Sequence, residues 1–194
     1  MPIHRKQYQE TSVSDIFELE ARDPEIYRKE TRKNTLILMA IFIVLAMSLA
    51  TLSVSFFGHP DGNNFKWNAA GVLAGFILTT IIFKQILLRQ PWMSSSLYGW
   101  KLKRCLMSIT NSMHHVETGV EQNDITAIKL LRFYHLGLMQ MHQLEGNDGG
   151  VSELQKPIQK LLLKIEALEL EPQQTRFDSA WIDSVKQSAK QKSV

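Results

Sequence analysis

Two long apolar runs, separated by a short polar segment, dominate the pattern of hydrophobic and polar positions along the chain. The first run, residues 35–57, contains no charged residue, and the second, residues 68–88, contains only Lys84. At 1.5 Å per residue, the first run forms a helix of about 34 Å, enough to cross a hydrocarbon core of about 30 Å with some tilt. The pattern therefore predicts a transmembrane helical hairpin.

Capping and turn-forming residues set the ends of the predicted elements. Asp23 accepts hydrogen bonds from free helix amides, and Pro24 needs no amide at the first helical position, so a long helix is expected to begin there. Gly58 and Pro60 stop this helix before a polar turn. The predicted parts are an N-terminal cytoplasmic segment (1–23), a helix with the first span (24–57) and a periplasmic turn (58–67). The second span (68–89), a cytoplasmic helical domain (90–171) and a C-terminal tail (172–194) follow.

Charge is distributed unevenly around the two spans. The formal net charge is only +3, and the basic residues gather before the first span and after the second, whereas the turn holds Lys66 offset by Asp61. The positive-inside rule then predicts that both termini face the cytoplasm. Cations placed beside apolar runs do not form the clustered patch of a nucleic-acid surface, so no nucleic-acid partner is expected. Residues predicted at the membrane interface are Trp67, Lys84 (its stem extended towards the headgroups), Trp92, Arg28, Lys29, Arg32 and Lys33.

Amphipathic helical patterns follow the second span. One extends from about Ser94 to Gly119, a second begins after Asp124, and a third follows the capping-box spacing at Ser152 and carries a heptad-like apolar stripe. Short connections favour an antiparallel bundle. The predicted fold class is all-α, with a two-helix transmembrane hairpin and a cytoplasmic antiparallel three-helix domain.

Both ends of the chain leave alternatives open. Ser14 could cap a short N-terminal helix that bears Ile16, Phe17 and Leu19, or the segment could be loosely ordered at the surface. After Pro172 the tail is either a short basic amphipathic helix, capped by Asp178 and bearing Trp181, Val185 and Ala189, or a disordered terminus.

Small residues recur at four-residue spacing in both spans. Such spacing lets helix backbones approach closely in lipid. Two interpretations remain open: this face closes the hairpin on itself, or it forms a homo-oligomer. The residues predicted to pack helices are Gly71, Gly75, Ala70 and Ala74 in the second span and Ala46 and Ala50 in the first.

Residues that could carry chemistry form no recognised site. The single Cys105 excludes an internal disulfide and a CxxC metal site. His135 and His142 share a helix face, but neither they nor His114 and His115 match a metal-ligand motif, so solvated or core-edge histidines are expected. We therefore expect no enzyme activity, no catalytic residue, no cofactor and no metal.

Several short motifs follow one another in a fixed order along the chain. They are Tyr27-Arg28-Lys29, Gly62-Asn63-Asn64-Phe65, Asn68-x-x-Gly71, Pro91-Trp92-Met93, Tyr98-x-Trp100-x-Leu102-Lys103, Asn123-Asp124-x-x-Ala127 and Phe133-Tyr134-x-x-Gly137-x-x-Gln140. Taken together, they resemble the DUF3087 family, uncharacterised membrane proteins of gammaproteobacteria. The resemblance covers residues 27–170 and implies two spans, an inner-membrane location and no assigned activity. The additional glycines Gly149-Gly150 and the tail after Pro172 depart from the family.

Three functions fit these features to different degrees. Amphipathic helices without a catalytic motif favour a membrane-anchored interaction or scaffold protein of the inner membrane, with the lipid bilayer and an unknown cytoplasmic protein as partners. The alternative is a small oligomeric transport or channel subunit, which the absence of acidic groups within the spans disfavours. A histidine-based metalloenzyme is the third possibility.

Overall fold

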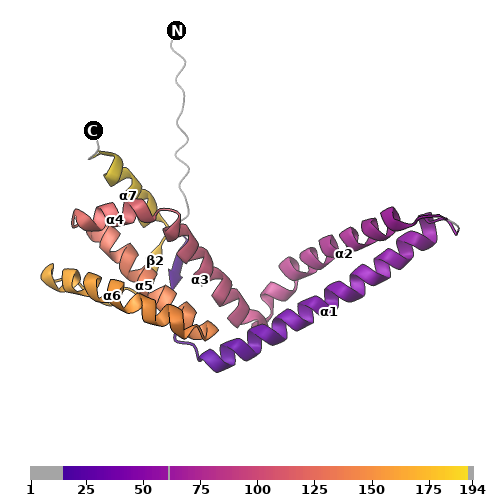
Figure 1. The fold of residues 1–194 in the computed structure, drawn as a ribbon, viewed down its shortest axis with the longest axis horizontal. Coiled ribbons are helices and arrows are strands. Elements are labelled where there is room, and N and C mark those ends of the chain that lie inside the picture. The colour runs from indigo at the N-terminus through magenta and orange to yellow at the C-terminus, as the bar shows by residue number, and fades with distance from the viewer. Residues whose placement is uncertain (1–14, 61, 192–194) are drawn as a thin grey trace, which may run out of the picture. The chain divides into compact units, whose positions relative to one another are not determined.

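The computed structural model describes residues 15–60 and 62–191, and the side chains of these up to residue 188. It divides the chain into two compact units, Arg22–Trp100 and Met1–Ala21 with Lys101–Val194. We call the first the hairpin unit and the second the helical domain. The described part is mostly helical, with a single small two-stranded sheet (Figure 1).

The hairpin unit is built on two long helices, α1 and α2. α1 spans Pro24–Phe57, the bounds that the capping pattern predicts, and Asp23 Oδ1 accepts from the amides of Glu25 and Ile26 at 2.8 and 2.9 Å. α2 spans Phe65–Gln85 and returns along α1 (Figure 1). Two 3₁₀ turns, η1 and η2, lead from α2 to α3; their bounds are Leu87–Arg89 and Pro91–Met93.

α2 begins three residues before the second span predicted from the sequence. Asn63 Oδ1 accepts from the amide of Phe65 at 2.9 Å, and the Asn64 side chain bonds both the amide and the carbonyl of His59. These side-chain bonds close the turn early, so that Lys66 and Trp67 belong to the helix rather than to the turn.

Both long helices are long and apolar enough to cross a membrane. Only 6% of the most apolar stretch of α1 and 22% of that of the second span is buried within the protein. The core helix of a soluble protein would be mostly covered. Exposed side chains such as Met47, Phe56 and Leu73 therefore form an apolar surface that fits a lipid environment.

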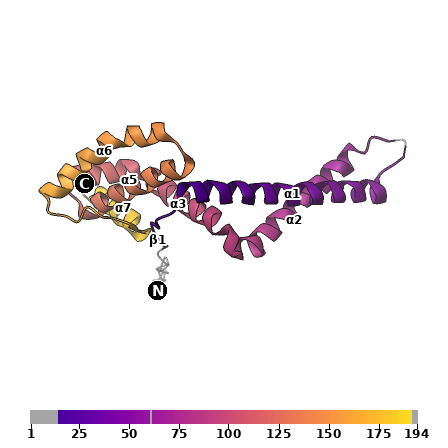
Figure 2. The same ribbon diagram turned by 90° about the horizontal axis from the view of Figure 1, so that it is seen from below.

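The helical domain contains four complete helices and most of a fifth. α3 begins within the hairpin unit and continues into the domain. α5 lies between α6 and α7 (Figure 2). The helices are α3 Ser94–Thr110, α4 Met113–Glu121, α5 Ile125–Glu145, α6 Asp148–Ala167 and α7 Ala180–Gln191.

The helix expected from Ser94 to Gly119 is divided in two. The break falls at Asn111 and Ser112, because short polar side chains favour caps and turns over helix interiors. The next boundary follows the sequence signal: Asp124 Oδ1 accepts from the amides of Thr126 and Ala127 at 2.8 and 3.2 Å and caps α5.

A small antiparallel sheet replaces the N-terminal helix that the sequence allowed. β1, Ile16–Glu18, pairs with β2, Arg176–Asp178, with Phe17 opposite Phe177. Of the two alternatives left open for this segment, the short helix is wrong, and its proposed cap, Ser14, lies outside the described residues. The alternation along β1 turns Phe17 inwards against Phe133, their ring centroids 6.4 Å apart.

The tail after Pro172 belongs to the folded domain. Asp178 Oδ1 accepts from the amide of Ala180 at 2.9 Å and starts α7. Ile182 and Val185 are buried in the same core as Phe133 and Phe177. The amphipathic helix is therefore present, and its apolar face packs inside the domain rather than against a membrane.

Candidate functional site

The small residues of the two spans meet within the hairpin. A Cβ built on Gly75 would lie 2.7 Å from Ala46 Cα and 2.9 Å from Ala46 N. A Cβ built on Gly71 would lie 2.6 Å from the amide nitrogen of Ala50 and the carbonyl oxygen of Leu49. Since real Cβ contacts are longer, both positions require glycine for this backbone approach.

The interleaved alanines of the second span lie elsewhere. Ala70 and Ala74 are exposed, whereas Gly71 and Gly75 are buried. The structure thus uses one of the two overlapping small-residue rows to close the hairpin and leaves the other on the exposed surface. The close approach of Gly71 and Gly75 is to α1 of the same chain.

A polar cluster centred on Asn34 lies at the end of the hairpin where α1 begins and α2 ends. We call this the open end, and the end at the connecting turn the closed end. Asn34 is 5% exposed, and its amide group donates to the carbonyl of Trp92 at 3.1 Å and to Ser96 Oγ at 2.9 Å. One turn before it, Glu30 accepts from the hydroxyl of Ser95. These three bonds fasten α1 to the chain segment that follows the second span.

Two contacts of aromatic side chains also lie at the open end. The guanidinium of Arg22 lies 4.5 Å from the ring centroid of Tyr98. A Cβ on Gly99 would overlap the hydroxyl of Tyr27, which is itself buried. Sequence reasoning missed this cluster, although a single asparagine at the edge of an apolar run was a visible signal. Its partners lie about sixty positions away and could not be identified from spacing.

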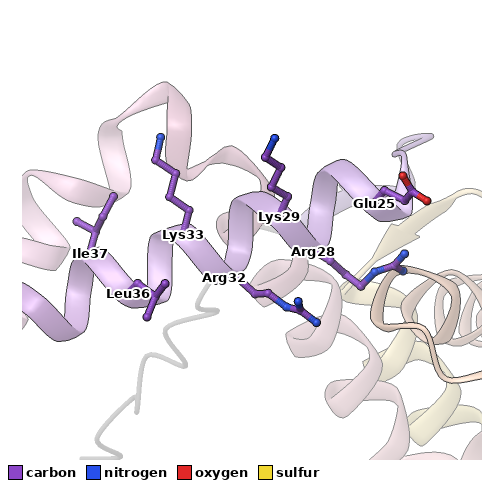
Figure 3. A pocket seen from close by; sticks show the side chains of 7 residues that line it. All are labelled: Glu25, Arg28, Lys29, Arg32, Lys33, Leu36 and Ile37. Carbon is purple, nitrogen blue, oxygen red and sulfur yellow. The ribbon is translucent and has the colours of Figure 1, made fainter.

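A basic surface, defined by Arg28, Lys29, Arg32 and Lys33, covers the start of α1 (Figure 3). Lys29 and Lys33 point to one side of the helix and Arg28 and Arg32 to the other, as four-residue spacing requires. A hollow of about 570 Å³ lies among these side chains and is lined by α1 alone, so it is a surface feature rather than an enclosed pocket. Each cation can attract an anionic lipid headgroup with about 1 kcal/mol.

The remaining predicted interface residues lie at the two ends of the hairpin. At the closed end, Trp67 stacks on Phe57 with ring centroids 5.1 Å apart. At the open end, Lys84 is exposed in the last turn of α2 and Trp92 is exposed in η2. The basic surface of α1 and Lys84 thus belong to the same, open end of the hairpin.

The histidines of the helical domain lie in different environments. His114 and His115 are neighbours with ring centroids 5.6 Å apart, and His142 Nδ1 lies 3.2 Å from the side-chain amide of Asn147. His135 is buried, and burial, with a smaller effect from Arg132, lowers its pKa from 6.5 to about 4. Among residues 15–60 and 62–191, no three His, Cys, Asp or Glu side chains are grouped so as to hold a metal ion.

Cys105 is a half-buried thiol on α3. Burial, together with the carboxylate of Asp15, raises its pKa from 9.0 to about 11, so the thiol form dominates at neutral pH. Arg104 and Lys101 act in the opposite direction but have smaller effects, so the thiol lacks the lowered pKa of an activated nucleophilic cysteine.

Comparison with known proteins identifies one family. A family model described as a protein of unknown function, DUF3087, matches residues 17–182. Neither the curated proteins nor the solved structures that were searched give a match to this chain.

Proposed function

Because this chain belongs to the DUF3087 family, whose description assigns no activity, we propose its function from the chain itself: it is a membrane-anchored interaction or scaffold protein of the bacterial inner membrane. In this proposal the hairpin unit is the anchor, the helical domain recognises a cytoplasmic protein, and the chain performs no catalysis of its own.

The pairing of β1 with β2 is the observation that carries the proposal. β1 precedes the first span and β2 follows the second, yet Phe17 and Phe177 are direct neighbours in the ladder. Strands can pair only on the same side of a bilayer. Two crossings between them satisfy this condition, whereas a single crossing does not.

The hairpin has the properties of a self-contained anchor. Gly71 and Gly75 seal its helices together, and Asn34 and Glu30 find their polar partners inside the same unit. The apolar side chains left exposed face outwards, where lipid would cover them. A helix pair that needs no second copy to cover its small residues supports an anchor more than an oligomeric channel.

The distribution of charge supports the orientation. The open end carries the basic surface of α1, Lys84 and Arg89, whereas the closed end has only Lys66 as a basic residue, 5.3 Å from the ring centroid of Trp67. The positive-inside rule assigns the open end, and with it both termini, to the cytoplasm.

The helical domain supports a role in recognition because it has a core of its own. Ile109, Val116, Leu130 and Phe133 are completely buried within it. At the same time Leu163, on α6, is 64% exposed. A stable domain held at the membrane surface can present such a face to a partner at high local concentration.

Proximity labelling tests the proposal directly. The labelling enzyme is fused to the C-terminus of the full-length chain, and the control fuses it to the hairpin unit joined to an unrelated helical domain. We expect a reproducible set of cytoplasmic or membrane-associated proteins that the full chain labels and the control does not. Identical labelled sets from both fusions would contradict a recognition role for the helical domain.

Location and orientation are tested with cysteine variants of the same chain. Single cysteines are introduced at His59 and Gln173 in a Cys105→Ser background and treated with a membrane-impermeant maleimide. We expect His59→Cys to react in spheroplasts and Gln173→Cys to react only after lysis. The reverse result would contradict the proposed orientation.

A further inference from the structure

A cleft of about 440 Å³ lies in the helical domain between α4, α5 and α6. Its volume falls within the range of sites that hold small molecules. The residues that line it come from three helices, which distinguishes it from the open hollow on α1. The proposed function makes no use of this cleft.

The inner part of the cleft is apolar. Val120 of α4, Leu131 of α5 and Leu161 of α6 line it, and the same three side chains pack together in one hydrophobic cluster. Leu161 is buried and the other two are half-buried. The inner part of the cleft therefore offers an apolar surface to a bound molecule.

His135 supplies a polar group inside this apolar surface. It is 5% exposed, it lines the cleft, and its Nδ1 is buried without a hydrogen-bond partner in the described structure. Nε2 is not among these buried unpartnered atoms, so it is the ring nitrogen that keeps some accessible surface, on a residue that lines the cleft. Because a buried N–H without an acceptor is costly, the neutral ring keeps its proton on Nε2 and offers a donor to the cleft.

The outer part of the cleft carries a pair of acidic residues on one wall and a pair of basic residues on the other. Glu117 and Glu121 stand one turn apart on α4, and Lys160 and Lys164 stand one turn apart on α6. Within the described residues, none of these four side chains forms an ion pair or a side-chain hydrogen bond. The α4 wall is thus complementary to a cation and the α6 wall to an anion.

We propose that this cleft binds a small zwitterion with an apolar body, the chemistry of a dipeptide of apolar amino acids. Its ammonium group lies towards Glu117 and Glu121, and its carboxylate lies towards Lys160 and Lys164. Its side chains cover Leu131 and Leu161, and one of its carbonyl or carboxylate oxygens accepts from His135 Nε2. The termini of an extended dipeptide are about 7 Å apart, which separates its two charges towards the two walls.

Burial of a polar group that the fold does not satisfy supports this assignment. A phenylalanine would fill the place of His135 without an unpartnered nitrogen, so the imidazole does not serve packing. Residues that break a local rule of stability are expected at functional sites. The inference goes beyond the proposed function and does not depend on a protein partner.

The test measures binding of leucyl-leucine to the full-length chain in lipid nanodiscs by calorimetry. Two matched ligands remove one charge each: N-acetyl-leucyl-leucine and leucyl-leucine amide. We expect saturable binding of the zwitterion, weakened about fivefold by either cap, as the loss of one exposed charge contact predicts. Absence of saturable binding at millimolar concentration, or equal affinity for all three ligands, would overturn the proposal.

Variants identify the site. Lys160→Glu is expected to reverse the preference between ligands, so that leucyl-leucine amide binds more tightly than leucyl-leucine. The control is Lys129→Glu, which makes the same change in charge at an exposed position outside the cleft. It is expected to keep the preference of the parent. His135→Phe is expected to lower affinity about tenfold with no loss of melting temperature. An unchanged preference in Lys160→Glu, or unchanged affinity in a folded His135→Phe, would place binding elsewhere and contradict the assignment.

Discussion

Gly75 of α2 lies directly against the backbone of Ala46 in α1, with room for a hydrogen atom and none for a methyl group. The ideal Cβ position on Gly75 is 2.7 Å from Ala46 Cα and 3.2 Å from Ala46 Cβ. Most of the atoms nearest to a Cβ at position 75 belong to the main chain, which cannot move away as a flexible side chain can. The contact therefore fixes how closely the two spans approach.

Gly75→Leu is accordingly expected to separate the spans and destabilise the hairpin unit by about 1–3 kcal/mol, the usual cost of overpacking. Ala74→Leu is the matched control, because Ala74 is exposed beside it on the same helix. Both are measured by thermal unfolding in detergent micelles, followed by circular dichroism. Equal melting temperatures for the two variants would show that the close approach contributes nothing to stability.

Asn34→Leu is expected to weaken the open end of the hairpin by about 1–3 kcal/mol, because Ser96 Oγ and the carbonyl of Trp92 lose their donor. The control is Thr35→Leu, the next position, where the hydroxyl bonds only within its own helix, to the carbonyl of Thr31 at 2.9 Å. Hydrogen exchange of peptides from η2 and early α3 reports the effect. We expect faster exchange in Asn34→Leu alone, and equal rates in both variants would refute the role of Asn34.

The stability of the helical domain is expected to fall as the pH falls from about 6.5 to about 4. The folded domain holds the pKa of His135 at about 4, below its ordinary value of 6.5, since burial and Arg132 both disfavour the charged ring. In this interval the unfolded chain binds a proton that the folded domain does not, so unfolding becomes more favourable as pH decreases. The contribution of His135 to the free energy of unfolding is fully present above pH 6.5 and has decreased by about 3 kcal/mol at pH 4.

His135→Phe isolates that contribution from the carboxylates that titrate in the same range. Urea unfolding of parent and variant is compared at pH 7 and pH 4. The parent is expected to lose about 3 kcal/mol more than the variant between these conditions. Parallel losses in both proteins would mean that His135 is not the titrating group.

Cys105 is expected to react slowly with a small alkylating reagent at neutral pH, because its raised pKa leaves little thiolate. Mass spectrometry follows modification of the native chain against the urea-unfolded chain. Unfolding should accelerate the reaction by at least about tenfold, since exposure restores an ordinary thiol pKa. Similar rates in the two states would contradict the buried environment described for α3.

Phe177→Ala is expected to destabilise the helical domain by about 3–5 kcal/mol, because Phe177 is 2% exposed and its ring centroid lies 5.3 Å from that of Phe133. Phe65→Ala removes the same atoms from a side chain that is 74% exposed at the start of α2. The second variant should unfold like the parent. If Phe177→Ala does so too, β2 does not belong to the core.

Local signals in the sequence were sufficient for the parts of the fold that depend on neighbours in the chain. Asp23 and Asp124 each cap a helix where their side chains predict it, because a cap needs only the next two or three amides. The family assignment from short ordered motifs is also confirmed over residues 17–182. The division of the helix at Asn111 was missed, since propensity alone does not decide such a break.

Features that depend on distant partners could not be read in the same way. β1 is three residues long, so its alternating pattern was too short to decide against a helix. Its partner strand comes only after both long helices in the sequence. Likewise, the spacing of Gly71 and Gly75 does not indicate which helix these residues contact. His135 looked like an ordinary core-edge histidine until burial and the surrounding cleft were known.

The ladder between Phe17 and Phe177 also has a consequence for the order of events during synthesis. β1 is translated before both long helices, and β2 after them. Both spans, and the helices α3 to α6, are translated in between, so the sheet can close only after the hairpin has been made. A chain that stops before Arg176 contains both long helices, but the core of its helical domain lacks Phe177, Ile182 and Val185. The core of the helical domain therefore cannot be completed until residues 176–185 have been translated.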